Sequence, residues 1–311
     1  MNALNQKILI ELMHNSRTPN TQIAKKVQSS REVVDYRIKQ LIKKNIIRGF
    51  ITEINTEKLG FLNSSLFLSI KSKAEEKLIK YIQECDFASW SSEFSGVWNY
   101  GIEIYGKNYL EIDENFQKIY KEFKEDIIDH RLSIHKTKES FFEKFLEIKK
   151  TFTTKKEIDY KIDSKDKTIL QELAKNSKTD ILKITKKIKL TAPATAKRIR
   201  KLEKSNYIKK YSIFVDPQDL GLIHYSIFIK NKNIDDKEKL KAHLKEHEKI
   251  SFLLEYVGDP FIEFGIITKK PYELRQILQE IEESFPDNRI TEVFMIQKEI
   301  LSLGPPKCVF E

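Results

Sequence analysis

The stretch Ser30–Asn45, SREVVDYRIKQLIKKN, has a counterpart later in the chain, Thr191–Asn206, TAPATAKRIRKLEKSN. In both stretches the apolar residues recur at helical spacing, which predicts a helix with one apolar face docked on a core. These residues are Val34, Ile38, Leu41 and Ile42 in the first stretch, and Thr195, Ile199 and Leu202 in the second. Each stretch opens on a hydroxyl residue, Ser30 or Thr191, which is expected to cap the helix by accepting from free backbone N–H groups. The opposite faces are basic, as a helix that enters the major groove of DNA requires.

An internal repeat relates the two stretches. A shift of 161 residues aligns Ile8–Gly60 with Ile169–Gly221 without a gap. The register continues past this window, because Ser65 and Phe67 match Ser226 and Phe228. The repeat therefore covers a whole structural unit and not only its first helices.

Each copy of the repeat begins with a helix-turn-helix pattern. An apolar face at Ile8, Leu9 and Leu12 predicts a first helix, and residues 21–27 and 182–188 predict a short second helix in the two copies. Three residues separate the short helix from the docked helix, which is the spacing of a helix-turn-helix. Residues 46–51 and 207–213 then have the composition of short β segments, interpreted as the wing of a winged helix.

The remainder of each copy shows an alternation of strand and helix patterns in the order βαββαβ, which is the ferredoxin-like arrangement. In the first copy the expected elements are 63–71, 74–85, 87–94, 98–105, 110–123 and 131–138; in the second they are 225–229, 237–247, 252–257, 261–268, 272–285 and 289–298. We therefore expect an α+β chain with two winged helix-turn-helix domains (1–60 and 162–221) and two ferredoxin-like domains (61–138 and 222–311). Residues 139–161 are expected to form an amphipathic connector helix whose aromatic side chains serve packing.

The positive charge of the chain is concentrated in two blocks. Net charge is +10, with 56 Lys and Arg against 46 Asp and Glu. Residues 1–60 carry an excess of +6 and residues 162–221 an excess of +8, whereas the rest of the chain carries −4. Each positive block contains one of the docked helices. Double-stranded DNA is the expected anionic partner of such a distribution.

Composition excludes several other classes of protein. A chain of 311 residues is long enough for more than one domain. It has no apolar run that would span a membrane and no secretory signal pattern at its start. Cys85 and Cys308 are too few for a disulfide framework or a metal cluster, so a reducing cytoplasm is the expected location, with no cofactor and no metal site.

Several motifs together make the chain similar to the leucine-responsive regulator/AsnC (Lrp/AsnC) family of prokaryotic transcription factors. The matches are Ile8-Leu9, Arg37-Ile38 with Leu41, Asn45-Ile46-Ile47 and Glu57-Lys58-Leu59-Gly60, and, in the second copy, Ile162-Asp163 with Asp166, Ile169-Leu170, Arg198-Ile199 with Leu202, and Asp216-Pro217 with Asp219-Leu220-Gly221. The resemblance covers nearly the whole chain twice, in a tandem form of the kind found in archaea. It implies a DNA-binding regulator whose ferredoxin-like (RAM-type) domains self-associate and can sense an amino-acid-like effector.

The candidate DNA-binding residues lie on and around the two docked helices. In the first copy they are Ser30, Arg31, Tyr36, Arg37, Lys39 and Lys43; in the second they are Thr191, Ala192, Ala196, Lys197, Arg198, Arg200 and Lys204. Flanking lysines are suited to phosphates, namely Lys25, Lys26, Lys43 and Lys44, and Lys186, Lys187, Lys201 and Lys204. Arg31 suits guanine, and Ala192 or Ala196 suits a thymine methyl group. Because the two faces differ, an asymmetric pair of half-sites is predicted.

For four residues of these helices, the sequence leaves two possible roles open. Glu32 and Asp35 either accept from cytosine or interact only with the positive N-terminal end of their helix. Arg37 and Arg198 lie next to the apolar stripe, so each either contacts a phosphate or forms a structural ion pair.

The resemblance places an effector near a glycine-containing turn between the middle strands of the ferredoxin-like domain. The corresponding residues here are Gly96 and Trp98 in the first copy and Gly258 and Asp259 in the second. The alternative is that both glycines only supply a turn with positive φ.

An enzyme is the main competing hypothesis, because the expected architecture is similar to that of the sirohaem decarboxylases. Such a site needs histidine in the middle strand pair of an α/β domain, and none of the six histidines falls there: His14, His130, His135, His224, His243 and His247. His243 and His247 lie four apart on a predicted helix and are either metal ligands or part of a solvated face. A sensor whose winged helices bind protein is the second alternative. No catalytic residue is predicted.

Overall fold

The computed structural model describes residues 2–146, 157–231, 234–258, 262–302 and 304–311. The chain divides into two units, and each unit combines parts of both copies of the repeat. Unit 1 comprises Met1–Phe61, Thr151–Asp216 and Ser302–Glu311, and holds both helix-turn-helix copies. Unit 2 comprises Leu62–Lys150 and Pro217–Leu301, and holds both α/β copies.

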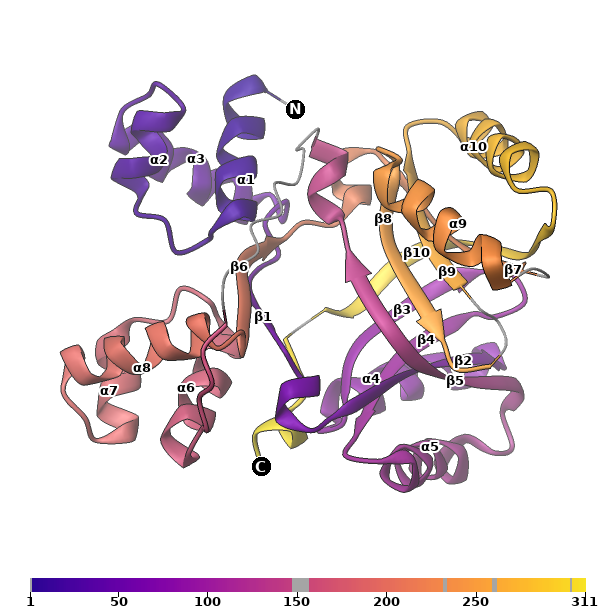
Figure 1. Ribbon diagram of the computed structural model, residues 1–311, viewed down its shortest axis with the longest axis horizontal. Coiled ribbons are helices and arrows are strands. Elements are labelled where there is room, and N and C mark those ends of the chain that lie inside the picture. Colours follow the sequence, from indigo (N-terminus) through magenta and orange to yellow (C-terminus); the bar gives the residue numbers. More distant parts are fainter. Residues whose placement is uncertain (1, 147–156, 232–233, 259–261, 303) are drawn as a thin grey trace. The chain divides into compact units, whose positions relative to one another are not determined.

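Unit 1 contains two three-helix domains (Figure 1). The first consists of α1 (Ala3–His14), α2 (Asn20–Lys26) and α3 (Arg31–Lys43), and the second of α6 (Ser164–Lys175), α7 (Ile181–Ile188) and α8 (Ala192–Lys204). Most of the apolar residues expected to face a core are buried, with Val34, Ile38 and Leu41 at the core of the first domain and Thr195, Ile199 and Leu202 at the core of the second. Ile42, also expected on the buried face, is 44% exposed, so the apolar face of α3 is narrower than predicted.

Local interactions explain where the docked helices α3 and α8 begin and end. The Ser30 hydroxyl accepts from the Val33 N–H (3.3 Å), and the Thr191 hydroxyl accepts from the Ala194 N–H (3.4 Å), as predicted for N-caps. The preceding turns contain Gln28 and Lys189 in the left-handed region, with φ of 54° and 52°. Asn45 and Asn206 follow the two helices with φ near 58° and are suited to this region because asparagine tolerates it.

The strand after each helix-turn-helix pairs with the strand of the other copy. β1 (Gly49–Ile54) and β6 (Ile208–Phe214) form a two-stranded antiparallel sheet, with Gly49 opposite Phe214 and Thr52 opposite Tyr211. The wing expected within each domain is therefore a single ribbon shared by both domains. β1 packs against α6 and β6 against α1, so that each strand lies on the helix of the other copy. The Thr52 hydroxyl donates to the Leu173 carbonyl (2.6 Å) across this contact.

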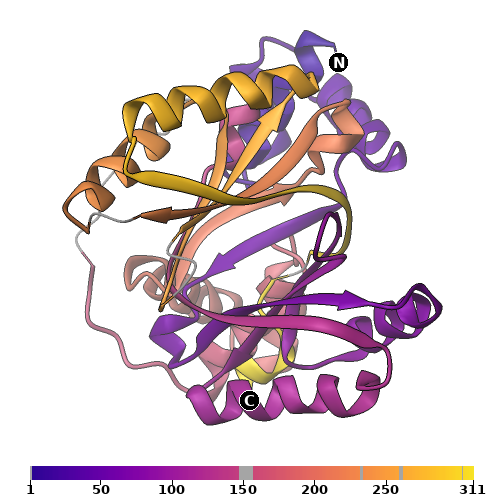
Figure 2. The same ribbon diagram turned by 90° about the vertical axis from the view of Figure 1, so that its right-hand side faces the viewer.

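Unit 2 contains two βαββαβ domains (Figure 2). The first α/β domain has β2 (Leu62–Ile70), α4 (Glu75–Glu84), β3 (Ala88–Ser95), β4 (Tyr100–Gly106), α5 (Tyr109–Phe123) and β5 (Ile127–Ser140). The second has β7 (Ile223–Asn231), α9 (Ile234–Glu246), β8 (Ile250–Tyr256), β9 (Ile262–Thr268), α10 (Pro271–Ser284) and β10 (Asn288–Ser302). The predicted elements are thus present with ends shifted by a few residues.

The strands of both α/β domains join into one closed sheet, in the order β10-β3-β4-β2-β5-β8-β9-β7. In Figure 2 the purple helix α5 and the gold helix α10 lie on the outer side of the strands of their own domains. Between the two domains the strands enclose a largely aromatic cluster that includes Phe67, Phe94, Phe228, Tyr256 and Phe294. The alternation along each strand therefore places one face against its own helices and the other against the second domain.

The segment after β5 differs from the predicted connector helix. β5 continues to Ser140, and a short 3-10 helix (η3) follows at Phe142–Leu146. The rest of the expected helix lies largely outside the described residues, and Glu157–Lys161 have no helical structure. The described part is extended because β5 pairs with β8 as far as Ser140, opposite Phe252. At the end of the chain, Lys307–Phe310 form a 3-10 helix (η5), and Phe310 packs against the core of the second three-helix domain.

Candidate nucleic-acid interface

The outward face of α3 carries the long polar and aromatic side chains predicted from the sequence. The Arg31 side chain is 63% exposed and Tyr36 is 60% exposed. Lys39 and Lys43 are exposed on the same helix. These side chains offer guanidinium, phenol and ammonium donors to a ligand that approaches α3 from outside the domain.

The two acidic residues of α3 differ in their surroundings. The pKa of Glu32 is lowered by a hydrogen bond with its own backbone N–H and then by the Ser30 hydroxyl, as expected for an acid at a helix N-terminus. Asp35 accepts from the Asn20 amide and lies 3.6 Å from the Arg31 guanidinium. Asp35 therefore holds α3 against α2 and orients Arg31.

The outward face of α8 has a different chemistry. Pro193 lies in the first turn, and the half-buried Ala192 and Ala196 leave this part of the helix smooth and apolar. Exposed cations follow at Lys197, Arg200 and Lys204. The first turn of α8 therefore presents methyl and methylene groups where α3 presents Arg31 and Glu32.

Arg198 is engaged within its own domain. Its guanidinium donates to Asp166 (Nη1 to Oδ1, 2.9 Å) and pairs with Asp163 (2.9 Å), while Tyr160 donates to Asp166 (2.7 Å). Asp166 is fully buried, and its hydrogen bond raises the pKa of Arg198. This geometry favours the ion-pair reading of Arg198 over phosphate contact.

Arg37, the copy of Arg198, has different neighbours in sequence. The positions that correspond to Asp163 and Asp166 are Asn2 and Asn5, which carry no charge. Arg37 makes no ion pair with any described residue. The difference makes Arg37, but not Arg198, available to an external anion.

Two of the lysines expected at phosphates form matching ion pairs. Lys26 lies 2.5 Å from Glu11, and its copy Lys187 lies 2.8 Å from Glu172. Both lysines stay about half exposed, so they connect the first two helices of their domains and still add to the positive surface. Lys25, Lys43, Lys44, Lys186 and Lys204 are exposed, and Lys201 lies over the Tyr160 ring at 5.0 Å.

Sequence reasoning missed the residues that connect the two three-helix domains. The hydroxyls of Ser16 and Ser177 are hydrogen-bonded at 2.6 Å and are fully buried. Arg17 donates to the carbonyl oxygens of Ser177 (2.5 Å) and Thr179 (3.3 Å) and lies over the Tyr211 ring at 5.4 Å. The identity of Ser16 and Ser177 in the repeat was the available signal, but it gave no indication that the two residues touch.

The two helix-turn-helix domains of the structure are also found by comparison with known proteins. A family model for winged helix-turn-helix DNA-binding domains matches residues 1–48 and again residues 162–209. The transcriptional regulator LrpC of Bacillus subtilis is 33% identical over 98 residues, which are 32% of this chain and 68% of LrpC. The regulator LrpA of Pyrococcus horikoshii is 30% identical over 117 residues, which are 38% of this chain and 83% of LrpA. The chain belongs to the Lrp/AsnC family of transcription regulators.

A solved structure shares the architecture of this Lrp/AsnC family member over almost its full length. The crystal structure of the siroheme decarboxylase NirDL superimposes with a TM-score of 0.64 and covers 97% of this chain and 94% of NirDL, at 11% sequence identity. At that identity the match shows a common fold. The duplicated architecture is thus shared with a protein described as a siroheme decarboxylase.

The predicted effector residues of the Lrp/AsnC chain are only partly described. Gly96 and Gly258 have φ of 146° and 87°, so both turns need the conformational freedom of glycine. Trp98 is buried in the cluster between the α/β domains, and its indole N–H donates to Glu292 (3.0 Å). Asp259 lies outside the described residues. The described geometry thus engages Trp98 in packing and hydrogen bonding within unit 2.

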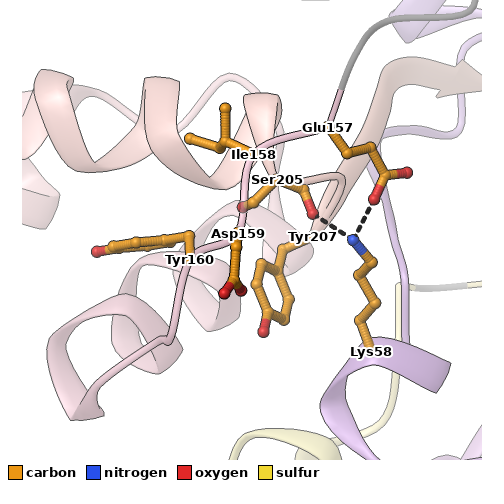
Figure 3. A pocket seen from close by; sticks show the side chains of 7 residues that line it. All are labelled: Lys58, Glu157, Ile158, Asp159, Tyr160, Ser205 and Tyr207. Carbon is orange, nitrogen blue, oxygen red and sulfur yellow. Dashed lines mark hydrogen bonds and ion pairs between the residues drawn. The ribbon is translucent and has the colours of Figure 1, made fainter.

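One surface cavity adjoins the second three-helix domain of this Lrp/AsnC protein (Figure 3). Its volume is about 330 Å³, and it is lined by Lys58, Glu157, Ile158, Asp159, Tyr160, Ser205 and Tyr207. The Lys58 ammonium pairs with Glu157 and donates to the Ser205 carbonyl (2.8 Å), as the dashed lines in Figure 3 show. Lys58 comes from the first copy and Ser205 from the second, so these contacts join the two copies within unit 1.

The described part of the chain contains no group of three or more His, Cys, Asp and Glu side chains arranged to hold a metal ion. His243 and His247 are close to each other and to Glu280, and the His243 ring contacts Phe285 at 5.4 Å. None of the described helices combines the length and apolar character needed to cross a bilayer.

Proposed function

We propose that the chain is a DNA-binding transcription regulator in which α3 and α8 read two unlike half-sites of an asymmetric operator. The observation that carries this proposal is the pairing of two different reading faces in one unit, connected by the β1–β6 ribbon. In an ordinary dimer of identical chains, the two reading helices are the same and favour a palindrome. Here one chain supplies both helices, and their first turns differ in every exposed side chain that reaches outward.

The two half-sites should differ in chemistry. Arg31 is suited to the O6 and N7 acceptors of guanine, and Tyr36 and Lys39 extend the polar contacts of α3. The smooth first turn of α8, with Ala192 and Ala196, is suited to thymine methyl groups, while Arg200 supplies one long donor. Exposed lysines on both domains supply phosphate contacts that do not depend on sequence.

Selection of bound duplexes from random-sequence DNA tests the proposal. Wild-type protein should select a site with two unlike halves. Arg31→Ala should relax specificity in one half and Arg200→Ala in the other, each at a cost of about 1–3 kcal/mol for the base pair concerned. Lys121→Ala on the exposed face of α5 serves as a control. A palindromic consensus, or equal loss in both halves from Arg31→Ala, would contradict the proposal.

An amino-acid-like effector and self-association through the α/β domains are further parts of the proposal. Membership of the Lrp/AsnC family supports both. The test is a thermal-shift screen with each of the common amino acids, followed by light scattering at several protein concentrations. If no amino acid raises the thermal unfolding midpoint, the effector is removed from the proposal. The proposed DNA binding would not be affected by that result.

A tetrapyrrole decarboxylase is the second candidate, favoured by the full-length fold match to NirDL. Against it, strands β3, β4, β8 and β9 contain no histidine, and the buried His135 and His224 are each engaged by a serine hydroxyl, Ser65 and Ser251. We therefore infer that the chain is not an enzyme. Incubation with sirohaem decides between the two, because a decarboxylase would release CO2 and lower the mass of the tetrapyrrole accordingly.

A further inference from the structure

Arg131 and Glu292 occupy the same place in the two α/β domains. In the first domain β2 pairs Phe67 with Arg131 of β5, and in the second β7 pairs Phe228 with Glu292 of β10. The two positions are 161 residues apart, which is the period of the repeat. Equivalent positions of the repeat therefore carry opposite charges in its two copies.

These two equivalent side chains bind each other. The Arg131 Nη1 donates to Glu292 Oε1 at 2.5 Å, and the second oxygen of Glu292 accepts from the Trp98 indole at 3.0 Å. The Arg131 guanidinium also lies over the rings of Phe67 and Phe228, at 4.9 and 4.6 Å from their centroids. Only 21% of the Arg131 side chain and 25% of the Glu292 side chain are exposed, so the charges are largely desolvated.

Contact between equivalent residues means that both lie at the approximate two-fold axis that relates the α/β domains. Phe67 and Phe228 confirm this location, because they are also equivalent and touch edge to face at 5.3 Å. At such an axis, a pair of identical domains would place each residue opposite its own copy. Two first domains would bring Arg131 against Arg131, and two second domains would bring Glu292 against Glu292.

A second position near the axis also differs between the copies. Gly101 lies opposite Phe67 in the first domain, and Glu263 lies opposite Phe228 in the second. The Tyr256 hydroxyl hydrogen-bonds both Glu263 and, across the domain boundary, Ser65 (3.1 Å). Two first domains would lack this carboxylate at both places, so the contact requires at least one second domain.

Unit 1 provides an internal comparison. Its equivalent residues at the domain contact, Ser16 and Ser177, are identical and hydrogen-bond each other. A pair of identical three-helix domains could make the same contact. Opposite charges at equivalent positions are therefore a feature of the contact in unit 2 and not of this contact in unit 1.

We propose that the Arg131–Glu292 pair makes the inner faces of the two α/β domains selective for each other, so that each domain accepts the opposite domain as its partner and rejects a second copy of itself. The partner of each inner face is thus the other half of this chain. The inference does not rest on DNA binding, because it concerns only unit 2.

Charge reversal in the full-length chain tests this inference. Arg131→Glu places acid against acid, and Glu292→Arg places base against base, so each should lower the thermal unfolding midpoint by roughly 5–10 °C. The double variant R131E/E292R restores opposite charges and should recover most of the loss. Arg289→Glu, an exposed reversal on the same strand β10, is the matched control and should change the midpoint little. Single variants as stable as wild type, or a double variant no better than the singles, would overturn the inference.

Co-expression separates selective pairing from simple stabilisation, and also serves if the single variants fold poorly. Two full-length chains with different affinity tags carry Arg131→Glu and Glu292→Arg respectively. If the two chains exchange domains, the first α/β domain of each chain packs against the second α/β domain of the other chain. In both of these pairs, the residues at positions 131 and 292 then have opposite charges. Co-purification of these two chains should exceed that of two differently tagged Arg131→Glu chains several-fold. Equal recovery in the two experiments would overturn the proposed selectivity.

Discussion

The hydroxyls of Ser16 and Ser177 are hydrogen-bonded at 2.6 Å, although one period of the repeat separates the two residues. Their backbone N–H groups bind equivalent carbonyls, because Ser16 donates to Tyr211 (3.2 Å) and Ser177 donates to Phe50 (2.9 Å). Each three-helix domain is thereby attached to the strand of the other copy. The Ser16–Ser177 contact, together with the hydrogen bonds of Arg17, joins the two reading domains directly.

Removal of both of these hydroxyls should cost less unfolding free energy than the sum of the two single removals. Ser16→Ala leaves the buried Ser177 hydroxyl without its partner, and the expected loss is about 1–3 kcal/mol of unfolding free energy. The double variant S16A/S177A should be less destabilised than the sum of the single variants, because no orphaned group remains. Urea unfolding of the three variants measures this, with the exposed Ser284→Ala as control. Strict additivity of the single effects would show that the hydrogen bond contributes nothing.

Arg37 and Arg198 should respond oppositely to alanine substitution. Arg37→Ala should reduce the slope of log affinity against log salt by roughly 0.9 for the lost phosphate contact, with little change in thermal stability. Arg198→Ala should lower stability by about 3 kcal/mol, because Asp166 is then buried without a cation, and should leave the salt slope nearly unchanged. Fluorescence anisotropy on duplex DNA and thermal unfolding provide the two readouts. A smaller salt slope for both variants would assign Arg198 to DNA as well.

Glu263 should make unit 2 less stable at alkaline pH. Burial raises the pKa of Glu263 to about 7, from an ordinary value of 4.5, although Ser226 and Tyr256 donate to its carboxyl group. Because the folded-state pKa is the higher one, its stabilising contribution is complete below pH 4.5 and is lost as pH rises through 7. Glu263→Gln should therefore be more stable than wild type at pH 8, by about 1–3 kcal/mol, and similar to it at pH 4.5. The measurement is urea unfolding at both pH values, with the exposed Glu282→Gln as control. A variant less stable at pH 8 would show that Glu263 is ionised and stabilising there.

Glu255 should make unit 2 less stable at acidic pH, which is the opposite of the dependence expected for Glu263. Burial opposes its ionisation, but hydrogen bonds from Lys136, Lys237 and Lys241 outweigh that effect and lower its pKa to about 2. Because the folded-state pKa is the lower one, the contribution is present above pH 4.5 and is lost as pH falls toward 2.

Glu255→Gln should therefore cost about 2–4 kcal/mol at pH 7, where the three lysines lose their common carboxylate. The difference from wild type should narrow steadily in unfolding experiments between pH 4.5 and pH 3. Glu248→Gln, at an exposed glutamate just before β8, is the control. An equal deficit at pH 7 and pH 3 would mean that packing and not charge explains the effect.

The sequence was informative about the candidate site where interactions are local. The positions of α3 and α8, their N-caps and the difference between their outward faces follow from side chains within a few residues of one another. The partner of Arg198 was not predictable in the same way, because Asp163 and Asp166 lie on another helix. The Asp pair was visible in the sequence, yet only packing of α6 against α8 shows that it reaches Arg198.

By itself, the sequence determined that the chain carries two copies of a helix-turn-helix followed by a βαββαβ domain. Helical periodicity, capping residues and strand alternation are properties of neighbouring residues. They can therefore be recognised in the sequence without knowledge of the rest of the molecule. Tertiary structure alone decided which strands pair, because alternation shows that a strand has a buried face but not what covers it. The pairing of β1 with β6 and the meeting of Arg131 with Glu292 both join residues about 160 positions apart, and no local pattern encodes such a contact.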